Sequence, residues 1–358
     1  MVLNAIPGIG PVMLKRLLDH FSEDPWEIIH ANPSKLTQIK GIGKKLIQSI
    51  TETNWMDWLS RETEKLSKMN GCFIDNAEIP SYLKELEDPP AGLYCLGEIP
   101  QLPCISIVGT RIPSSYGKKY ARELARDLAS AGVCVVSGMA RGIDTEAHLG
   151  ALEAGGKTIA FLGSGLDVIY PPENLGLYQK IISSGAVLSE FPLGKKADRR
   201  TFPMRNRLVA GVSLGVVVIE SAKAGGSMIT ARFAAEQGRT VFALPGRIDH
   251  AESAGCLSLI RDGATLVRNC KDILSEIAPM MNHTSPVDLR SKIPEPPNHH
   301  NLDPSEQKII EVLRGDILDL EQIQQLTEMP LNEVMATTTM LEIQSLIHKR
   351  PDGRFEIN

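Results

Sequence analysis

The sequence predicts an α/β protein: a doubly wound, mostly parallel, Rossmann-like sheet, with a helical domain before it and a small winged-helix-like domain after it. Short apolar runs alternate with helical patterns between about residues 104 and 278, and these runs are rich in β-branched residues without strict polar alternation. Such runs are typical of strands that are buried on both faces of a parallel sheet. The 358 residues, of which 42% are hydrophobic, suffice for two or three domains.

Composition and pattern divide the chain into five expected segments. They are a helix-hairpin-helix-like domain at 1–60, a connector at 61–92, the Rossmann-like domain at 93–278, a proline-rich linker at 279–304 and a winged-helix-like domain at 305–358. The linker contains the adjacent pair His299 and His300, which we interpret as incidental rather than as metal ligands.

The first fifty residues contain a small internal repeat. The two copies, Leu3–Leu18 and Leu36–Ile50, each place Gly-Ile-Gly before an amphipathic helix. Glycines allow a tight turn and leave N–H groups free at a helix N-terminus, where a phosphate can bind. The pattern is typical of a tandem helix-hairpin-helix module, and it predicts secondary DNA-backbone contacts by Gly41, Gly43, Lys44 and Lys45. The alternative is a packing domain, because the first copy has Pro11 and Val12 in place of the two lysines.

The central domain is expected to contain short strands with helices between them. The strands are expected at 93–96, 105–109, 133–137, 158–162, 186–190, 215–220, 240–244 and 264–267. The helices are expected near 115–131, 144–155, 173–184, 203–211, 227–237 and 254–262.

The last segment combines three helical patterns with a hairpin pattern. The helices are expected at 305–313, 319–326 and 330–345, and two short runs flank Pro351-Asp352-Gly353. Three helices and a hairpin resemble a winged helix. Residues 279–358 carry 7 basic and 13 acidic residues, so electrostatics do not favour DNA binding there. A protein-contact or regulatory role is at least as well supported.

Positive charge gathers in the middle of the chain. The net charge is −5, but residues 104–278 carry 21 basic and 16 acidic residues, whereas residues 1–103 carry 10 and 14. One run in this middle part holds a single acid, Asp198, among the cations Lys195, Lys196, Arg199, Arg200, Arg205 and Arg207. A charge run is usually a solvated face, but the apolar stretch Phe202–Met204 interrupts this one and predicts packing. We therefore count the cations of this run among the residues expected to contact DNA.

In a doubly wound sheet, ligands bind beyond the carboxyl ends of the strands. Four predicted strands end in glycine together with a hydroxyl or an arginine, all at one edge of the sheet. Glycine lets a backbone approach a ligand, while hydroxyl, N–H and guanidinium groups bind anionic oxygens. The candidates are Gly109, Thr110, Arg111, Ser137, Gly138, Arg141, Gly142, Gly163, Ser164, Gly165, Gly225, Gly226 and Ser227. Each motif alone is no more than a turn, but together they predict a phosphate-binding site.

Other kinds of site are not predicted. The sequence has no GxGxxG after the first strand of the sheet and no GxxxxGK[ST], which argues against a dinucleotide or Walker-type ATP site. No catalytic residue, metal or cofactor is expected, and we assign His148 to packing and Asp144 to a helix N-cap. Six scattered cysteines, no apolar stretch of about 18 residues and no signal-peptide pattern are typical of a cytoplasmic protein that does not enter membranes.

The strand-end motifs resemble those of the DprA/Smf family of DNA-processing proteins. The matching stretches, from about Leu93 to Leu274, are VGTR, SGMARGID, GSGLDVIYPPEN, SEFPLG…FPMRNR, GGSMITARFAAEQGR and ALPG. The resemblance implies a cytoplasmic homodimer without catalytic activity, which binds single-stranded DNA and loads the RecA recombinase during natural transformation. It also implies that most of the strand-end residues above contact DNA, together with Arg205, Asn206, Arg207 and Thr230.

Two other classes of function compete with this one. Nucleotide phosphoribohydrolases of the lysine-decarboxylase-like type share such a sheet and carry PGGxGTxxE, but this chain has AGGSMITARFAAE, with Ala231 or Arg232 near the position of the acid. The other class is a structural adaptor that acts through the acidic termini. For DNA binding, aromatic residues are few, so phosphate contacts should dominate, with Tyr170 and Phe202 as the nearest stacking candidates. Dimerisation is expected at the edge formed by 250–267.

Overall fold

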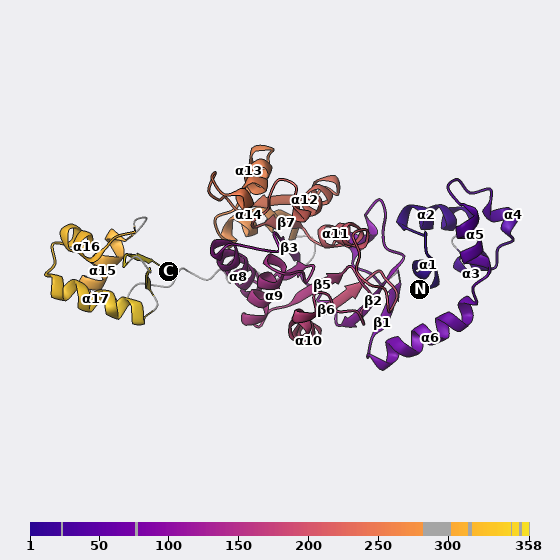
Figure 1. Ribbon diagram of the computed structural model, residues 1–358, viewed down its shortest axis with the longest axis horizontal. Coiled ribbons are helices and arrows are strands. Elements are labelled where there is room, and N and C mark those ends of the chain that lie inside the picture. Colours follow the sequence, from indigo (N-terminus) through magenta and orange to yellow (C-terminus); the bar gives the residue numbers. More distant parts are fainter. Residues whose placement is uncertain are drawn as a thin grey trace. The chain divides into compact units, whose positions relative to one another are not determined.

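The computed structural model describes residues 1–22, 24–75, 78–281, 302–313, 317–344, 346–350 and 353–357 (Figure 1). The chain divides into two units, Met1–Ile293 and Pro294–Asn358. His299 and His300, with most of the segment expected to be a linker, lie outside the described residues. Within the described part of the chain, no helix has the length and apolar character needed to cross a membrane.

A nine-stranded sheet forms the centre of the first unit. Its strands are β1 (Cys72–Asp75), β2 (Gly92–Gly97), β3 (Cys104–Val108), β4 (Cys134–Ser137), β5 (Thr158–Leu162), β6 (Ala186–Ser189), β7 (Gly215–Val218), β8 (Thr240–Ala243) and β9 (Thr265–Leu266). Their order in the sheet is β1-β2-β6-β5-β4-β3-β7-β8-β9. Strands β3 to β9 run parallel to one another, whereas β2 is antiparallel to both β6 and β1. The predicted doubly wound, mostly parallel sheet is therefore confirmed.

The pattern-based prediction found every strand except β1. The seven runs expected between 105 and 267 are β3 to β9, and the short run at 93–96 is β2. Strand β1 lies in the expected connector, residues 61–92, which therefore contributes to the sheet rather than only linking two domains. Its four residues include exposed Cys72 and Asp75, so no apolar run marks it. Pairing with β2, with Cys72 opposite Cys95, defines this strand.

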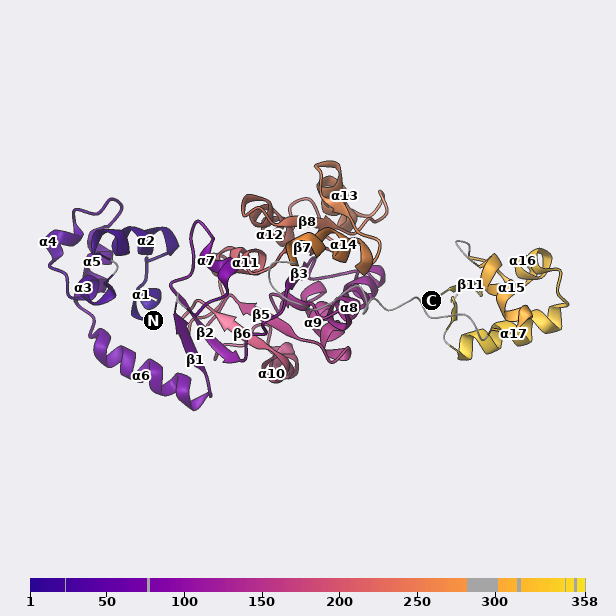
Figure 2. The ribbon, with the colours of Figure 1, turned by 180° about the vertical axis from the view of Figure 1, so that it is seen from behind.

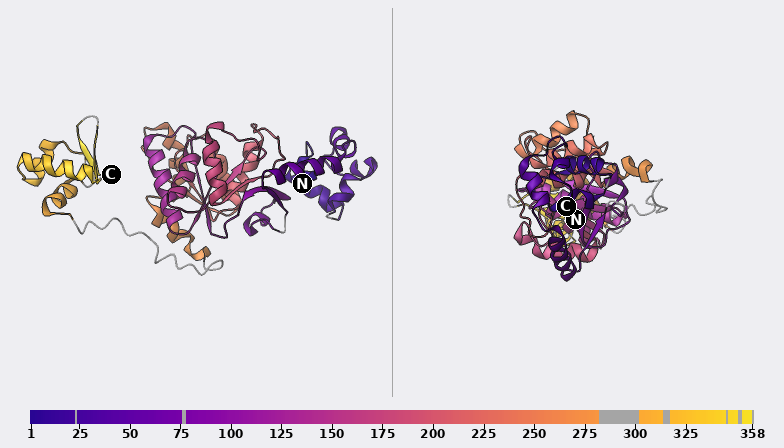
Figure 3. Two further views of the ribbon diagram at one scale, coloured as in Figure 1. Left: turned by 90° about the horizontal axis from the view of Figure 1, so that it is seen from below. Right: turned by 90° about the vertical axis from the view of Figure 1, so that its right-hand side faces the viewer.

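Helices cover both faces of the sheet (Figure 3). One face carries α8 (Ser115–Ser130), α9 (Ile143–Glu153), α10 (Leu175–Ser184) and α14 (Cys270–Met281). The other carries α7 (Ser81–Lys84), α11 (Thr201–Gly211), α12 (Gly226–Glu236) and α13 (Ala254–Arg261). Neighbouring strand residues such as Val135 and Val136 are buried in the cores on opposite faces, which explains why the strands lack polar alternation. Helix α14 runs into the segment expected to be a linker.

The N-terminal helices form a core of their own. They are α1 (Val2–Ala5), α2 (Pro11–His20), α3 (Pro25–Ile29), α4 (Pro33–Leu36), α5 (Lys44–Thr51) and α6 (Trp55–Lys68) (Figure 2). Both Gly-Ile-Gly turns use their first glycine at a φ of +96°, at Gly8 and Gly41. Hydrogen bonds join these helices to the sheet region. The Asn4 side chain donates to the Gly92 carbonyl at 3.1 Å, and the Leu193 N–H donates to the Glu62 carboxylate at 2.7 Å.

The second unit contains the expected three helices and hairpin. The helices are α15 (Pro304–Val312), α16 (Leu320–Thr327) and α17 (Leu331–Ile343), and the hairpin strands are β10 (Ile347–Lys349) and β11 (Phe355–Ile357). Capping boxes begin α15 and α16, at Asp303 and Asp319. The side chains of Ile309, Ile323 and Leu341 form part of its separate core.

Candidate nucleic-acid interface

The candidate site lies at the carboxyl edge of the sheet, where the chain order reverses beside β3. This strand lies between β4 and β7, and a Rossmann-type dinucleotide would bind in the crevice between β3 and β7. Here a protein carboxylate fills that place. Glu220, which follows β7, accepts hydrogen bonds from the Ser114 N–H at 2.9 Å and from the Ser114 hydroxyl. A Cβ atom at Gly117, in the first turn of α8, would lie 2.3 Å from the Glu220 carboxylate.

A hollow opens beside this crevice, over the ends of β3, β4 and β5. It is lined by Arg111, Gly138, Ala140, Arg141, Gly163, Ser164, Tyr170, Pro171, Ala197, Phe202 and Arg205. The fold thus brings together three of the predicted strand ends with the basic run that leads into α11. We call this feature the arginine hollow.

Arg205 is the most deeply buried cation of the hollow. Only 6% of it is exposed, and its Nε has no partner among the described residues. Its Nη1 lies 3.9 Å from a carboxylate oxygen of Asp144. Burial lowers the pKa of Arg205, and the Asp144 charge opposes that shift. The guanidinium stays protonated at neutral pH because an arginine pKa lies far above 7. Because a single carboxylate at this distance balances the buried charge only in part, the surroundings of Arg205 favour binding of an anion.

The turn after β4 makes room for this cation. A Cβ atom at Gly138 would lie 1.1 Å from Arg205 Nη1, so this position requires glycine. The Asp144 carboxylate accepts hydrogen bonds from the N–H groups of Gly138 at 3.2 Å and Ala140 at 3.3 Å. Asp144 therefore shapes the turn instead of acting as the expected N-cap, a position that Gly142 occupies. Burial raises the pKa of Asp144 and Arg205 opposes the shift.

Two aromatic rings and a second cation form the outer part of the hollow. The Arg111 guanidinium lies 5.0 Å from the centroid of the Phe202 ring, which is 6.0 Å from the Tyr170 ring at 49°. Both Arg111 and Tyr170 are exposed. Arg141 also reaches the hollow, but its Nε donates to the Glu173 carboxylate. Cations beside accessible aromatic rings can bind the phosphates and bases of a single-stranded nucleic acid.

The family of the chain follows from comparison with known proteins. The sequence matches the family DNA recombination-mediator protein A over residues 70–278, a SAM-like helix-hairpin-helix tandem over 1–53 and the DprA winged helix domain over 293–353. The chain belongs to the DprA/Smf family. The membership and the three kinds of domain expected from the sequence are thereby confirmed.

Curated relatives and solved structures of DprA/Smf proteins agree with this. The chain is 35% identical to protein Smf of Synechocystis over 99% of its own length and 96% of that protein. It is 40% identical to DNA processing protein DprA of Bacillus subtilis over 58% of this chain and 71% of that protein. DprA of Streptococcus pneumoniae matches with a TM-score of 0.68 and 33% identity, covering 77% of this chain and 95% of that one.

A further solved structure of the family concerns nucleic acid directly. DNA processing protein A of Helicobacter pylori, described for its unique mode of binding single-stranded DNA, matches with a TM-score of 0.54 and 34% identity. The match covers 59% of this chain and 96% of that one.

The structure places several predicted residues of this DprA/Smf chain away from the hollow. Arg207 is 3% exposed, and its guanidinium donates to both oxygens of Glu190, at 2.6 and 2.7 Å, with Asp88 3.2 Å from its Nε. In this structure its guanidinium is therefore engaged by two carboxylates of the protein, and its contact with phosphate stays a prediction. Ser137 is also fully buried, and its hydroxyl donates to the Ile107 carbonyl at 2.7 Å. Asn206, which lies between Arg205 and Arg207 in α11, is half-buried and does not line the hollow.

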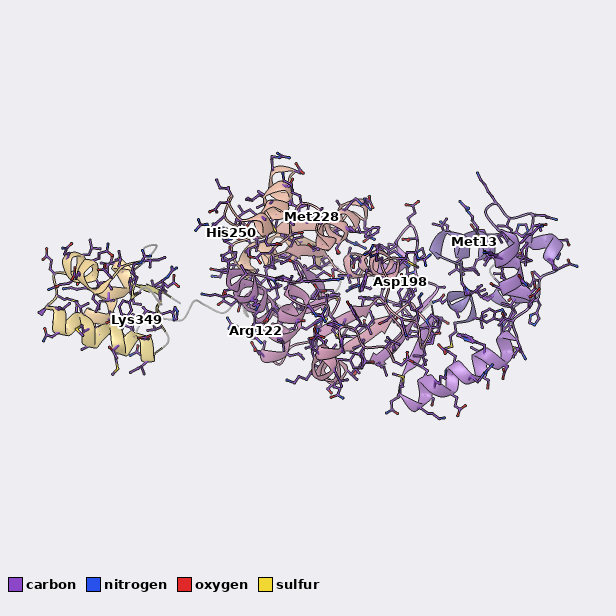
Figure 4. The ribbon with its side chains drawn as sticks, viewed as in Figure 1. Met13, Arg122, Asp198, Met228, His250 and Lys349 are labelled. Atoms are coloured by element: carbon purple, nitrogen blue, oxygen red, sulfur yellow. The ribbon has the colours of Figure 1, made fainter. Side chains whose placement is uncertain are left out.

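The turn Gly225–Thr230, which begins α12 after β7, does not line the hollow either. Its hydroxyls are satisfied or buried: Ser227 donates to Ser221 at 2.8 Å, and Thr230 is 2% exposed. Figure 4 shows the first turn of α12, labelled at Met228, over a different part of the sheet from Asp198, just before α11. We call this feature the β7 turn.

The other predicted residues take two kinds of position. Gly109, Thr110, Gly142 and Gly165 belong to the turns around the hollow without lining it, and Gly142 adopts a φ of +77°. The cations Lys196, Arg199 and Arg200 are exposed on the segment before α11, where Lys195 lies 3.1 Å from Asp198. Gly41, Gly43, Lys44 and Lys45 are exposed at the start of α5 and also lie outside the hollow.

Sequence reasoning missed Glu220 and gave Asp144 the wrong role. Nothing in the local pattern around Glu220 indicates that its carboxylate crosses to the start of α8, 106 residues earlier. The assignment of His148 to packing agrees with its position: it is fully buried, and its Nδ1 lies 2.7 Å from the Thr158 hydroxyl. Burial, followed by the nearby Arg205 charge, lowers the pKa of His148 to about 3.

Proposed function

We propose that this protein binds single-stranded DNA in the arginine hollow, without catalysis and with little sequence preference. The observation that carries the proposal is the buried Arg205, whose Nε has no partner among the described residues, beside Arg111, the half-buried ring of Phe202 and the exposed ring of Tyr170. Phosphate oxygens would complete the hydrogen bonding of these cations, and Tyr170 and Phe202 would stack on bases. The mode of binding named for the Helicobacter pylori relative supports the same chemistry.

The hollow favours a strand over a duplex. Its rings and buried cation lie within one small depression, which suits bases that are free to turn toward the protein. Contacts to phosphates position a nucleic acid without reading its sequence. The basic segment 195–200 supplies further charge beside the hollow.

The experiment is a titration of fluorescent single- and double-stranded oligonucleotides at several salt concentrations. We expect tighter binding of the single strand, no need for metal or nucleotide, and an affinity that falls steeply with salt because bound phosphates release counterions. Equal affinity for duplex, or a requirement for Mg-ATP, would contradict the proposal. Hydrolysis of a nucleoside monophosphate in a parallel assay would favour the phosphoribohydrolase alternative instead.

We also propose that the protein acts as a homodimer that loads RecA on incoming DNA in the cytoplasm during natural transformation. Family membership supports this role, and an apolar sheet edge supports the dimer. On edge strand β9, Leu266 is 41% exposed, while Leu257 and Ile260 of α13 are half-buried. A two-fold contact would present each of these residues twice and would join two hollows on one strand.

Sedimentation of the wild type and of Leu257→Glu tests the dimer. A wild type that remains monomeric at tens of micromolar, roughly the range in which a useful dimer must persist, would overturn it. RecA loading is tested by following RecA assembly on a single strand with and without this protein. An unchanged rate of assembly would contradict the loading role.

A further inference from the structure

A second groove adjoins the arginine hollow, at the boundary between the N-terminal helices and the sheet. It encloses about 400 Å³, and its walls come from residues far apart in sequence. One wall is the first helical hairpin, Gly8-Ile9-Gly10, and the other includes Lys195, Arg200 and Met204. We call it the hairpin groove.

We propose that the hairpin groove holds the continuation of the same DNA single strand that occupies the arginine hollow. The inference rests on the proposed function and extends it to a second binding site. The first hairpin, which lacks lysines of its own, would bind the strand with cations supplied by the segment before α11.

The two depressions share a wall, which makes a continuous path. In α11, Phe202 and Arg205 line the hollow, whereas Thr201 and Met204 line the groove. Residues three apart lie on one face of a helix, so neighbouring faces of the same helix form the two sites. A strand that leaves the hollow over this helix enters the groove directly.

The charge of the groove is favourable for phosphate. Two acids line it, but both are already engaged by the protein. Asp198 accepts hydrogen bonds from the backbone N–H groups of Arg200 and Thr201, at 2.8 and 3.1 Å, and pairs with Lys195. Glu190 is bound by the buried Arg207. The exposed guanidinium of Arg200 makes no ion pair among the described residues, which leaves it available to a phosphate.

The hairpin adds backbone donors to this wall. Gly10 is the N-cap of the ten-residue helix α2, its backbone is extended, and no side chain caps the helix. A Cβ atom at Gly10 would meet nothing within 4 Å. The apolar lining, which includes Pro7, Ile9 and Pro192, offers surface for the flat faces of bases.

The groove is a fixed feature of the first unit because its two walls are bonded together. Asn4, in α1, donates to the carbonyls of both Gly92 and Glu190, at 3.1 and 3.4 Å. The Glu62 carboxylate of α6 accepts the Leu193 N–H. The second hairpin does not take part, because Gly43 and Lys44 do not line the groove. From the sequence this copy was the better candidate, since two lysines follow its glycines.

The two hairpins offer a matched pair of variants, Gly10→Asp and Gly43→Asp. Both glycines are N-caps with extended backbones and open space at Cβ, and aspartate is a favourable N-cap, so neither change should unfold its helix. Each adds one negative charge, so a general effect of net charge is the same in both. Only Gly10→Asp places that charge in the groove.

Affinity is measured for thymidine oligomers of about six and about twenty nucleotides, lengths that span the usual range of single-strand sites. We expect Gly10→Asp and Arg200→Ala to weaken binding of the long oligomer about three- to tenfold and to change the short one less than about twofold. Gly43→Asp should weaken binding of the long oligomer less than Gly10→Asp does, because its charge lies outside the groove.

Three results would overturn the inference: a long oligomer bound equally well by wild type and Gly10→Asp, equal losses for Gly10→Asp and Gly43→Asp, or equal losses for short and long oligomers. In each of these cases binding in the hollow still stands. A wild type that binds neither oligomer refutes the proposed function itself. Thermal unfolding of each variant confirms that the comparison is made on folded protein.

Discussion

The arginine hollow and the β7 turn lie on opposite sides of β3 and have similar sequences, but the fold uses them differently. Both follow parallel strands and both contain glycines, with Ser164 in the hollow and Ser227 in the β7 turn. In the hollow, a helix from elsewhere inserts Arg205 and Phe202 over the turn. At the β7 turn, Ser227 donates to Ser221, so the hydroxyl is satisfied internally. If the hollow binds phosphate as we propose, a glycine-hydroxyl motif becomes an anion site only where the tertiary structure brings it an incompletely paired cation.

The largest expected effect comes from filling the space that Arg205 occupies. In Gly138→Ala, the new methyl group collides with the guanidinium, whereas at Gly226 a Cβ meets nothing within 4 Å. We expect Gly138→Ala to lower single-strand affinity about a hundredfold, near the 3 kcal/mol of a strong charged hydrogen bond, and Gly226→Ala to leave it within about twofold. Fluorescence anisotropy measures both, with circular dichroism as the check on folding. Similar affinities for the two variants would remove the distinction between the two turns.

A smaller effect is expected at the rim of the hollow. Arg111→Ala removes an exposed cation that lies over Phe202, and we expect about a tenfold loss, alike for every DNA sequence. Arg141→Ala is the matched control, because that guanidinium is already paired with Glu173, and it should cost about twofold. Binding by a folded Arg111→Ala variant at wild-type affinity would show that the rim is assigned wrongly.

The pH dependence of stability tests the buried groups beneath the hollow. His148 has its pKa lowered to about 3 in the folded protein, so between its ordinary value near 6.5 and that value the unfolded chain binds a proton that the folded protein does not. Stability is therefore lost as the pH falls through this window. One proton contributes about 1.4 kcal/mol per pH unit.

Relative to His148→Asn, we expect the wild type to lose about 2 kcal/mol of unfolding free energy between pH 7 and pH 5, measured by urea denaturation. Carboxylates such as Asp144 are present in both proteins, so their contributions largely cancel in the difference. Parallel curves for the two proteins would mean that His148 is not held neutral by its surroundings.

The smallest effect is expected at the β7 turn itself. Gly226→Pro removes the first N–H of α12, a position that tolerates proline, and Gly225 before it is already extended. If the free N–H groups of this helix bind no phosphate, DNA affinity should stay within about twofold of the wild type. A loss of tenfold or more would make the β7 turn a second anion site and would weaken the contrast drawn above.

Most of the fold was predictable because burial on both sheet faces gives continuous apolar runs. Strands β3 to β8 each carry such a run, whereas β1, with two exposed residues among four, has no local signal and is defined by its partner. The winged helix was predictable from local sequence signals as well, because two of its helices begin at capping boxes, at Asp303 and Asp319.

The site was predictable at its turns but not at its charges. Arg205 and Arg207 are two residues apart in one basic run, and the sequence treats them alike. The first reaches the hollow, whereas the second points to Glu190 and is neutralised there. The two lie on different faces of α11, so a choice between them requires knowing which face meets the sheet edge. Only the tertiary structure shows which face of α11 meets the sheet edge.

The carboxylate of Glu220 has a consequence for how the proposed DNA binding would be reversed. It occupies the crevice in which related sheets bind dinucleotides, and it is held there by the backbone and hydroxyl of Ser114. The crevice therefore offers no place for a nucleotide whose hydrolysis could switch the protein between tight and weak binding of DNA. Transfer of a strand to another protein would instead be governed by relative affinities and concentrations, so that the recipient, rather than a hydrolysed fuel, drives the exchange.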